Sequence, residues 1–573
     1  MAIVENEVSV SDTQARGPAQ TSLLREITSL LRPFWKVALL ATAMGAASGL
    51  STVWLLATVN RALHAGTGVS AVLLLSFAAL CVVTIAGEII SDLGNGYVGQ
   101  SVVARLRQDL TQKILSAPIE EIERFRVHRI TTVMNQDIDI ISTFTFGFSS
   151  LAIALAITIG CFAYLTVLSP AMSLIAVAAI ALGSWAHAAA RLRGRRGFEA
   201  AREAQDELQR QYRAITEGAK ELRIDRRRRR RIRDTQLAVT IERIRSLRVR
   251  AMRIFMSANA FGSALFFVVI GLVLALHGTL SASEPVVSGF VIVLLYVKGP
   301  LAQLISALPL LGQAQVAVRR VAELSRRFSN SEANLFVDTE PGPETARPCM
   351  ISMRRVAYSY PADEGASRFT LGPVDLDIRP GEMLFLVGEN GSGKTTLIKL
   401  LLGLYEPRDG LILWDGVPVV ADTRDDYRQM FSTVFSDYYL FDDIVLRPEQ
   451  AAEAAGYLER LELGHKVVVQ DGRFSTVDLS TGQRKRLALV HAYLDRRPIL
   501  VFDEWAADQD PAFRRIFYTE ILPGLKREGR TLVVISHDDR YFHVADRVVH
   551  MSDGRIRAID TVAAEPRAAR AAG

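Results

Sequence analysis

Eight consecutive residues in the C-terminal half have the spacing of a phosphate-binding loop. Residues 388–395 read Gly-Glu-Asn-Gly-Ser-Gly-Lys-Thr and fit the pattern G-x-x-x-x-G-K-[ST]. An apolar run over 383–387 precedes the motif and a helical run over 396–402 follows it, which predicts the strand–loop–helix context that the motif requires. Glycines let the backbone wrap a polyphosphate, and the N–H groups of the loop and helix direct positive dipole at the anion. A glycine-rich turn that binds nothing is the alternative, and the flanking strand and helix disfavour it.

The loop side chains have predicted tasks in nucleotide binding. Lys394 supplies a charge for the outer phosphates, and the Thr395 hydroxyl is placed to hold Mg²⁺. Upstream, Tyr360 is placed to stack on an adenine ring, but a tyrosine of the core explains it too, and this residue alone does not decide. The loop positions predicted to contact the nucleotide are Gly388, Asn390, Gly391, Ser392, Gly393, Lys394, Thr395 and Thr396.

Two later apolar strands end in residues suited to phosphate chemistry. The strand over 498–502 is followed by Asp503, expected to hold hydrated Mg²⁺, and by Glu504, expected to orient or deprotonate the attacking water. His537 follows a second strand over 531–535 and is placed to donate to the γ-phosphate. A lone histidine is usually structural, but its position directly after a strand favours the catalytic role.

A second anion site is predicted before the helix over 484–495. The preceding residues 479–483 read Leu-Ser-Thr-Gly-Gln, and the N-terminus of this helix offers unpaired N–H groups. The chain already contains one phosphate loop, so this site is predicted to serve the ATP of another copy. Two copies arranged head to tail would enclose two nucleotides, which predicts a homodimer. The predicted contacts are Ser480, Thr481, Gly482 and Gln483.

The chain is too long for one ordinary domain, and its two halves differ in composition. It has 573 residues, of which 49% are hydrophobic and 22% charged, and the first 320 residues contain long apolar runs. Six of these runs approach the roughly 20 apolar residues that a membrane-spanning helix needs. Buried core helices are the alternative, which six long runs in succession disfavour. The runs are about 36–60, 70–94, 145–168, 171–190, 254–276 and 285–310.

The connections between these runs alternate in length and charge. The short ones hold one basic residue, Arg61, whereas 95–144 and 191–253 are long and rich in arginine. By the positive-inside rule, the long connections and both termini are expected in the cytoplasm. They are predicted to extend the membrane helices and to present contact turns near 117–124 and 217–226 to the nucleotide domain. Six arginines at 226–231 are interpreted as a solvated helix face rather than a nucleic-acid or anionic-lipid site.

These features predict an α-helical six-span membrane domain fused to an α/β P-loop nucleotide-binding domain. Residues 1–20 lack the pattern of a signal peptide and are expected to form a flexible tail. The three cysteines have no metal-ligand spacing and do not suggest a disulfide framework. The expected divisions are a membrane domain over 21–328, a linker over 329–347, a nucleotide domain over 348–562 and a tail over 563–573.

The order of phosphate loop, LSTGQ, Asp-Glu strand and His537 resembles the ATP-binding cassette (ABC) family. The six preceding runs resemble its half-size exporters, and the resemblance covers about 20–562. The strings LSTGQRKRLAL (479–489), DEWAADQDP (503–511) and SHDDRYF (536–542) are similar to cyclic-peptide and peptide-siderophore exporters of the pyoverdine and syringomycin type. The resemblance implies a metal aspartate at Asp503, a catalytic glutamate at Glu504 and a switch histidine at His537. It also places Asp508 and Asp510 in a loop that crosses between subunits.

Two positions depart from the family pattern. In the signature motif of the family, which reads LSTGQ (479–483) here, Thr481 replaces the first glycine. The backbone at Thr481 must therefore accept a negative φ. Ser436 stands where the family has a glutamine that senses Mg²⁺. Because serine is too short to span the same gap, either Ser436 acts through a water or Asp437 takes part. Ser436 is kept as a candidate metal ligand, and neither residue is named as a confirmed one.

The predicted function is ATP-driven export of a peptide-like compound across the bacterial cytoplasmic membrane by alternating access in a homodimer. The cargo implied by the resemblance is a cyclic peptide, a lipopeptide or a siderophore precursor, with ATP and Mg²⁺ as cofactors and membrane lipid around the spans. No nucleic-acid partner is predicted. A lipid or multidrug exporter, an importer on an exporter fold, and an ATP-gated channel or regulatory subunit are the alternatives. The intact set Lys394, Asp503, Glu504 and His537 argues against an inactive ATPase.

Overall fold

The chain folds into a helical unit and a mixed α/β unit. The computed structural model describes residues 32–65, 70–125, 127–276, 283–336, 349–360, 369–444 and 450–562. The first unit comprises Met1–Leu110 and Ile130–Ser325, and the second comprises Thr111–Arg129 and Arg326–Gly573. The tails predicted at 1–20 and 563–573, and residues 337–347 of the predicted linker, lie outside the described residues.

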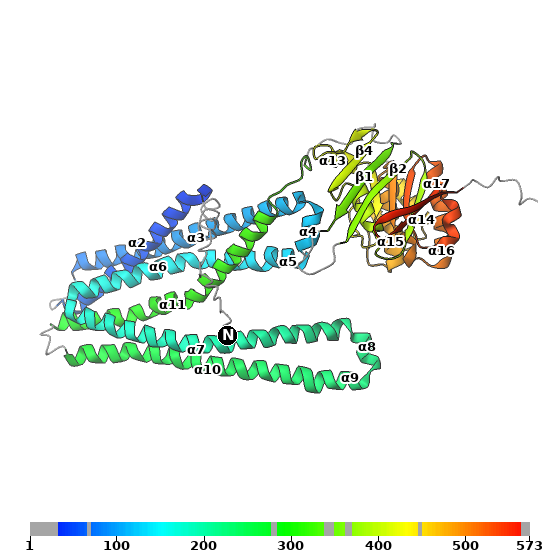
Figure 1. Cartoon of the computed structure of the whole chain (residues 1–573). Coiled ribbons are helices and arrows are strands. Elements are labelled where there is room, and N and C mark those ends of the chain that lie inside the picture. Colours follow the sequence, from blue (N-terminus) through cyan, green and yellow to red (C-terminus); the bar gives the residue numbers. More distant parts are fainter. Residues whose placement is uncertain are drawn as a thin grey trace, which may run out of the picture. The chain divides into compact units, whose positions relative to one another are not determined.

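The first unit is built from long helices (Figure 1). Short π-helical turns, η2 (Val133–Asp137) and η3 (Ile232–Leu237), lead into two of them. The helix α7 begins where Ser169 caps its N-terminus and a proline occupies the first helical position. The main helices are α2 (Trp35–Leu63), α3 (Ala71–Ser116), α6 (Ile138–Leu168), α7 (Pro170–Glu217), α10 (Ala238–Leu276) and α11 (Glu284–Arg327), with the short α5 (Val127–Thr132), α8 (Ala219–Ile224) and α9 (Arg226–Arg231) between them.

Five helices in the described part of the chain are long and apolar enough to cross a membrane. They lie within Arg32–Leu63, Ala71–Ser116, Arg129–Leu168, Arg226–Leu276 and Glu284–Arg327. The remaining predicted span, 171–190, falls in α7, where the apolar helix Pro170–Gly183 is shorter than a full span. The predicted fold class is thus confirmed for the first unit, which is a helical membrane domain.

Several of these helices are much longer than a bilayer is thick. The helices α3, α7, α10 and α11 have 46, 48, 39 and 44 residues. At about 1.5 Å per residue they are roughly 60–70 Å long, against about 30 Å for the hydrocarbon core. Helices α7 and α10 run side by side and are joined by α8 and α9 (Figure 1). The long arginine-rich connections are therefore helical extensions, as predicted.

Small residues let α2 and α6 approach closely. A Cβ on Gly49 would lie 2.8 Å from Cβ of Ala156 and 2.9 Å from the carbonyl oxygen of Ile153. A Cβ on Gly160 would lie 2.9 Å from a methyl carbon of Val53. In a membrane, no hydrophobic effect drives helices together, because the lipid tails are as apolar as the helix surfaces. Close backbone packing of this kind is therefore a main source of helix association.

The second unit contains a mostly parallel sheet and a smaller antiparallel sheet. Strand order in the larger sheet is β12-β11-β3-β10-β9-β6, with β3, β6, β9, β10 and β11 parallel and β12 antiparallel at the edge. The smaller sheet has the order β2-β1-β4-β5. Strand bounds are β1 (Ile351–Ser359), β2 (Thr370–Ile378), β3 (Met383–Gly388), β4 (Asp409–Trp414), β5 (Val417–Pro418), β6 (Phe431–Val434), β9 (Ile499–Asp503), β10 (Thr531–Ile535), β11 (Arg547–Ser552) and β12 (Arg555–Thr561), with a separate hairpin β7 (Val469–Gln470) and β8 (Arg473–Phe474).

The parallel strands β3, β9 and β10 read as continuous apolar runs because both faces of the sheet are covered. Their carboxyl ends meet at one edge of the sheet, which is where open α/β sheets bind their ligands. The helices of this unit are α4 (Ile119–Phe125), α12 (Lys394–Leu401), α13 (Arg424–Arg428), α14 (Gln450–Arg460), α15 (Thr481–Leu494), α16 (Pro511–Ile516) and α17 (Leu522–Arg527), with the turns η5 (Trp505–Asp508), η6 (Phe517–Ile521) and η7 (Asp539–Val544).

The short helix α4 belongs to this second unit, although the sequence analysis placed it in the membrane domain. Its Glu123 carboxylate accepts hydrogen bonds from Lys399 Nζ at 2.8 and 2.9 Å and from the hydroxyl of Tyr405. Ile119 packs against the core that includes Tyr405. The contact turn expected near 117–124 is therefore present, whereas the one expected near 217–226 stays a prediction.

Candidate active site

The phosphate-binding loop lies between β3 and α12, and its glycines have the backbone conformations that the motif requires. Gly388, Gly391 and Gly393 have φ values of 151°, 81° and 101°. A Cβ on Gly388 would lie 2.2 Å from the carbonyl oxygen of Met551, whereas nothing lies within 4 Å of one on Gly391. Glycine at 388 thus permits close packing on β11, and glycines at 391 and 393 permit the left-handed turn.

The side chains of this loop fit a polyphosphate. Lys394 is buried, and its Nζ donates to the carbonyl oxygens of Gly388 at 2.9 Å and Glu389 at 3.0 Å. Burial lowers the pKa of Lys394, while the charges of Glu504 and Asp503 act in the opposite sense. The Oγ of Ser392 is buried and has no hydrogen-bond partner among the described residues. An unsatisfied buried hydroxyl costs about 1–3 kcal/mol, a cost that an accepting phosphate oxygen would remove.

The next residues of α12 split into an exposed and a buried position. Thr395 is exposed at the start of the helix, so its hydroxyl is accessible to a cation. Thr396 is buried, and its Oγ1 lies 3.1 Å from the hydroxyl of Tyr360. The Tyr360 ring makes edge contacts with Tyr358 and Tyr405 at centroid distances of 5.2 and 6.0 Å. Tyr360 therefore has the contacts of a core residue, and its stacking on adenine stays a prediction.

Asp503 ends β9 with a side chain that is almost fully buried. It is 1% exposed, and its Oδ2 accepts a hydrogen bond from Ser436 Oγ at 3.2 Å. Burial raises the pKa of Asp503, and the Ser436 hydrogen bond lowers it. These carboxylate and hydroxyl oxygens, with that of Thr395, are the hard ligands that Mg²⁺ prefers. Ser436, which stands where the family has a glutamine, lies beside the predicted metal aspartate.

Glu504 adopts an unusual backbone conformation directly after β9. Its φ of 50° and ψ of 33° are left-handed, a region that costs a non-glycine residue about 1–3 kcal/mol unless its surroundings impose it. Its Oε1 lies 2.9 Å from Nε2 of His537, which follows β10. The two residues come from neighbouring parallel strands, so the sheet brings together a carboxylate and an imidazole in the geometry of a base and its orienting group.

The signature residues form the first turn of α15 rather than a loop before it. Ser480 is the N-cap, and a capping box joins its hydroxyl to the N–H of Gln483 and the Gln483 side chain to the N–H of Ser480, both at 3.4 Å. Thr481 is not among the described residues with positive φ, so the negative φ expected there is present. Among the described residues of one chain, no hydrogen bond or ion pair joins 480–483 to 388–396. Their predicted contact with the nucleotide of a second copy stays a prediction.

Comparison with known proteins identifies the family. Residues 371–507 match the family described as ABC transporter, and residues 34–299 match the ABC transporter transmembrane region. The chain is 34% identical over 498 residues to the ATP-binding protein SyrD of Pseudomonas syringae pv. syringae, across 84% of this chain and 87% of that protein. The chain belongs to the ABC transporter family. The fold, and the resemblance on which it was predicted, are confirmed.

The chain is also similar to a protein named as a lipid flippase and to a solved exporter structure. It is 26% identical over 508 residues to the ATP-dependent lipid A-core flippase of Methylobacillus flagellatus, across 84% of this chain and 82% of that protein. It also aligns with a solved structure of a bacterial Atm1-family ABC exporter with ATP bound, with a TM-score of 0.67 and 18% identity, over 93% of this chain and 96% of that chain. The protein is therefore a multi-pass membrane ABC transporter whose ATPase activity is coupled to transport.

Three polar residues of this ABC transporter's site were missed by the sequence analysis. Lys485 lies 2.7 Å from Asp508, and Arg486 lies 2.6 Å from Asp510 and 2.9 Å from the side-chain oxygen of Gln509. Asp508 and Asp510, which the resemblance placed in a loop crossing between subunits, are thus paired within their own chain. The sequence did offer a sign of these contacts. Lys485 and Arg486 stand between the signature and the apolar residues of α15, where a buried charge needs a partner.

Proposed function

We propose that this ABC exporter works as a homodimer that moves a peptide-like compound out of the bacterial cytoplasm. The nucleotide unit and both chain ends face the cytoplasm in this proposal, because the arginine-rich connections do. The observation that carries the cargo class is the match to SyrD over most of the chain, at a higher identity than the flippase match of equal coverage. The three strings that resemble peptide exporters, at 479–489, 503–511 and 536–542, support the same cargo class.

In this proposal each task in ATP hydrolysis is assigned to particular residues of this chain. Lys394 and the loop N–H groups bind the outer phosphates, and the signature turn of the second copy closes over them. Thr395 and Asp503 would hold Mg²⁺, directly and through water, and the bound ion would neutralise charge developing on the phosphates. Glu504 accepts the proton of the attacking water, and His537 orients the Glu504 carboxylate and donates to the γ-phosphate.

The helix α12 offers a direct route from the phosphate site to α4. It begins at Lys394 in the phosphate loop, and Lys399, one turn and a half further on, holds Glu123 of α4. A rigid helix that is pulled at its N-terminus by a nucleotide moves its later residues as well. We therefore assign Glu123 the transmission of nucleotide binding toward the membrane helices.

Replacing Glu123 by alanine is expected to uncouple transport from hydrolysis. The substitution removes an acceptor of charge-assisted hydrogen bonds worth about 1.5–3 kcal/mol each, so cargo transport falls by about tenfold or more. ATP affinity is unchanged, because Glu123 does not reach the phosphate loop. Transport and ATP binding are measured in proteoliposomes, with Glu121→Ala on the same helix as the control. Equal transport by Glu123→Ala and wild type would remove Glu123 from the coupling route.

The cargo class is tested by reconstitution with alternative substrates. A cyclic lipopeptide is expected to stimulate ATP hydrolysis and to accumulate inside inside-out vesicles. The second candidate function is lipid export, which the flippase match favours. Stimulation by lipid A and not by the lipopeptide would replace the peptide cargo with a lipid. Depletion of cargo from inside-out vesicles would show import.

A further inference from the structure

The helix that carries the signature also carries a buried ammonium group that contacts the catalytic turn. Lys485 lies two residues after Gln483, and its side chain is 3% exposed. Its Nζ lies 2.7 Å from Asp508 Oδ2 and donates to the carbonyl oxygen of Glu504 at 3.1 Å. An ammonium group is removed from water only where its partners are well placed, so this is a built contact rather than a surface ion pair.

The carbonyl group that Lys485 binds belongs to the residue with the left-handed backbone. That carbonyl oxygen also accepts the N–H of Ala507 at 3.2 Å, which closes the turn η5. On the other side, the indole N–H of buried Trp505 donates to the backbone carbonyl of Lys485 at 2.9 Å. The Glu504 carbonyl and the Trp505 indole are therefore both bonded to one residue of α15. A strained conformation persists only where its surroundings over-determine it, and these contacts supply that constraint.

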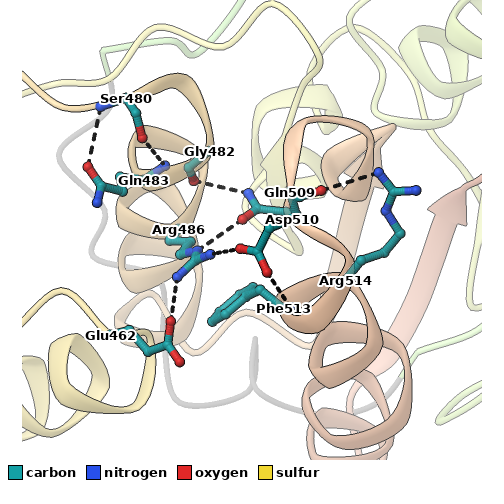
Figure 2. Close-up of polar contacts among 9 residues, drawn as sticks. All are labelled: Glu462, Ser480, Gly482, Gln483, Arg486, Gln509, Asp510, Phe513 and Arg514. Carbon is teal, nitrogen blue, oxygen red and sulfur yellow. Dashed lines mark hydrogen bonds and ion pairs between the residues drawn. The ribbon is translucent and has the colours of Figure 1, made fainter.

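A second set of contacts joins the signature turn to the same segment (Figure 2). The guanidinium of Arg486 donates to Gln509 and pairs with Asp510, and it lies 3.5 Å from the ring centroid of Phe513. Gln509 in turn donates from Nε2 to the carbonyl oxygen of Gly482 at 3.0 Å. Hydrogen bonds and ion pairs thus join the signature turn to the segment 504–510, and Lys485 is the residue of α15 that binds Glu504.

We propose that Lys485 is a positioning residue for Glu504. By holding the Glu504 carbonyl, it keeps the left-handed turn that directs the carboxylate toward His537. Because Lys485 and the signature turn belong to the same helix end, contact of that turn with a second copy's nucleotide sets the orientation of Glu504 at the chain's own phosphate loop. The inference rests on the proposed role of Glu504 as the base, and it couples the two nucleotide sites of the dimer through a named side chain.

Two substitutions of Lys485 test whether its donor to the Glu504 carbonyl is the feature that matters. Lys485→Met keeps the length of the apolar stem but has no donor, whereas Lys485→Arg keeps both the donors and the charge. We expect Lys485→Met to lower kcat about tenfold, a part of the roughly 10²–10⁴-fold contribution of a general base, with KM and ATP affinity almost unchanged. Lys485→Arg is expected to retain at least about half of the wild-type kcat, because its guanidinium N–H groups can donate to the same carbonyl.

The experiment uses the full-length protein in lipid nanodiscs, with kcat normalised to the nucleotide-binding sites counted by titration. Lys526→Met is the matched control, because it removes another lysine–aspartate contact, 2.6 Å from Asp546, outside this site. A kcat for Lys485→Met equal to that of wild type would overturn the inference. So would an equal loss in both Lys485 variants, or a raised KM at unchanged kcat.

A double-mutant cycle with Glu504→Gln distinguishes failure of this inference from failure of the proposed base. If Lys485 acts through Glu504, Lys485→Met lowers the single-turnover rate of the Glu504→Gln protein by less than about twofold. A further tenfold loss in that background would show a role independent of Glu504 and overturn the inference. Retained turnover by Glu504→Gln alone would instead overturn the assignment of the base, whatever the Lys485 variants do.

Discussion

Glu504→Gln is expected to lower steady-state ATP hydrolysis by about 10²–10³-fold while leaving ATP affinity almost unchanged. The amide has nearly the shape of the carboxylate but does not take a proton from water. The 2.9 Å contact with His537 Nε2 can be kept by the amide, so the local geometry is preserved. Lys394 and the loop backbone, which bind the phosphates in our proposal, are untouched.

The measurement is phosphate release by the full-length protein in nanodiscs with saturating Mg²⁺, beside equilibrium binding of ATP. Glu453→Gln is the matched control, because Glu453 pairs at 2.6 Å with Arg496 on the same unit away from the sheet edge. It is expected to hydrolyse ATP as wild type does. If Glu504→Gln turns over ATP at the wild-type rate, Glu504 is not the base.

Lys394→Ala is expected to abolish measurable hydrolysis and to weaken ATP binding by about 100-fold or more. Two charge-assisted hydrogen bonds to phosphate oxygens are worth about 1.5–3 kcal/mol each, and about 2.8 kcal/mol corresponds to 100-fold. The buried ammonium, now bonded to the carbonyl oxygens of Gly388 and Glu389, is the strongest cationic feature of the loop. Removing it also takes one donor from each of those carbonyl groups, although the Glu389 carbonyl still accepts the N–H of Ser392 at 3.1 Å.

Equilibrium binding of a fluorescent ATP analogue measures this effect, with Lys526→Ala as the control for loss of a lysine. The two large predictions differ in kind, because Glu504→Gln keeps nucleotide affinity and Lys394→Ala loses it. An ATP affinity of Lys394→Ala within about twofold of wild type would show that loop N–H groups alone carry the binding. Hydrolysis lost at unchanged affinity would move Lys394 from binding to the chemical step.

Features that depend on contiguous residues were predictable from the sequence. The strand and helix expected around the phosphate loop are present as β3 and α12, because the motif specifies a backbone path within 15 residues. The strands before Asp503 and before Ser536 are present as β9 and β10. Apolar runs of five residues bounded by polar ones suffice to place a buried strand.

Contacts between distant segments were not predictable in this way. The pairing of Lys485 with Asp508 and the Glu504 carbonyl joins residues about 20 apart whose approach depends on how α15 packs against η5. The assignment of α4 to the nucleotide unit depends on Glu123 meeting Lys399, which is 276 positions away. Periodicity records which face of an element is apolar and says nothing about which partner a buried charge will find.

By itself, the sequence determined that this protein combines a membrane-spanning helical domain with a phosphate-binding α/β domain. Hydropathy and backbone-specifying motifs depend on neighbouring residues, so they can be recognised in the sequence without knowledge of the fold. Only the tertiary structure decided that Glu504 takes a left-handed turn, that His537 meets its carboxylate, and that the signature helix holds that turn through Lys485. These arrangements arise from the parallel order of β3, β10 and β9, which brings the ends of strands far apart in the chain to one edge of the sheet.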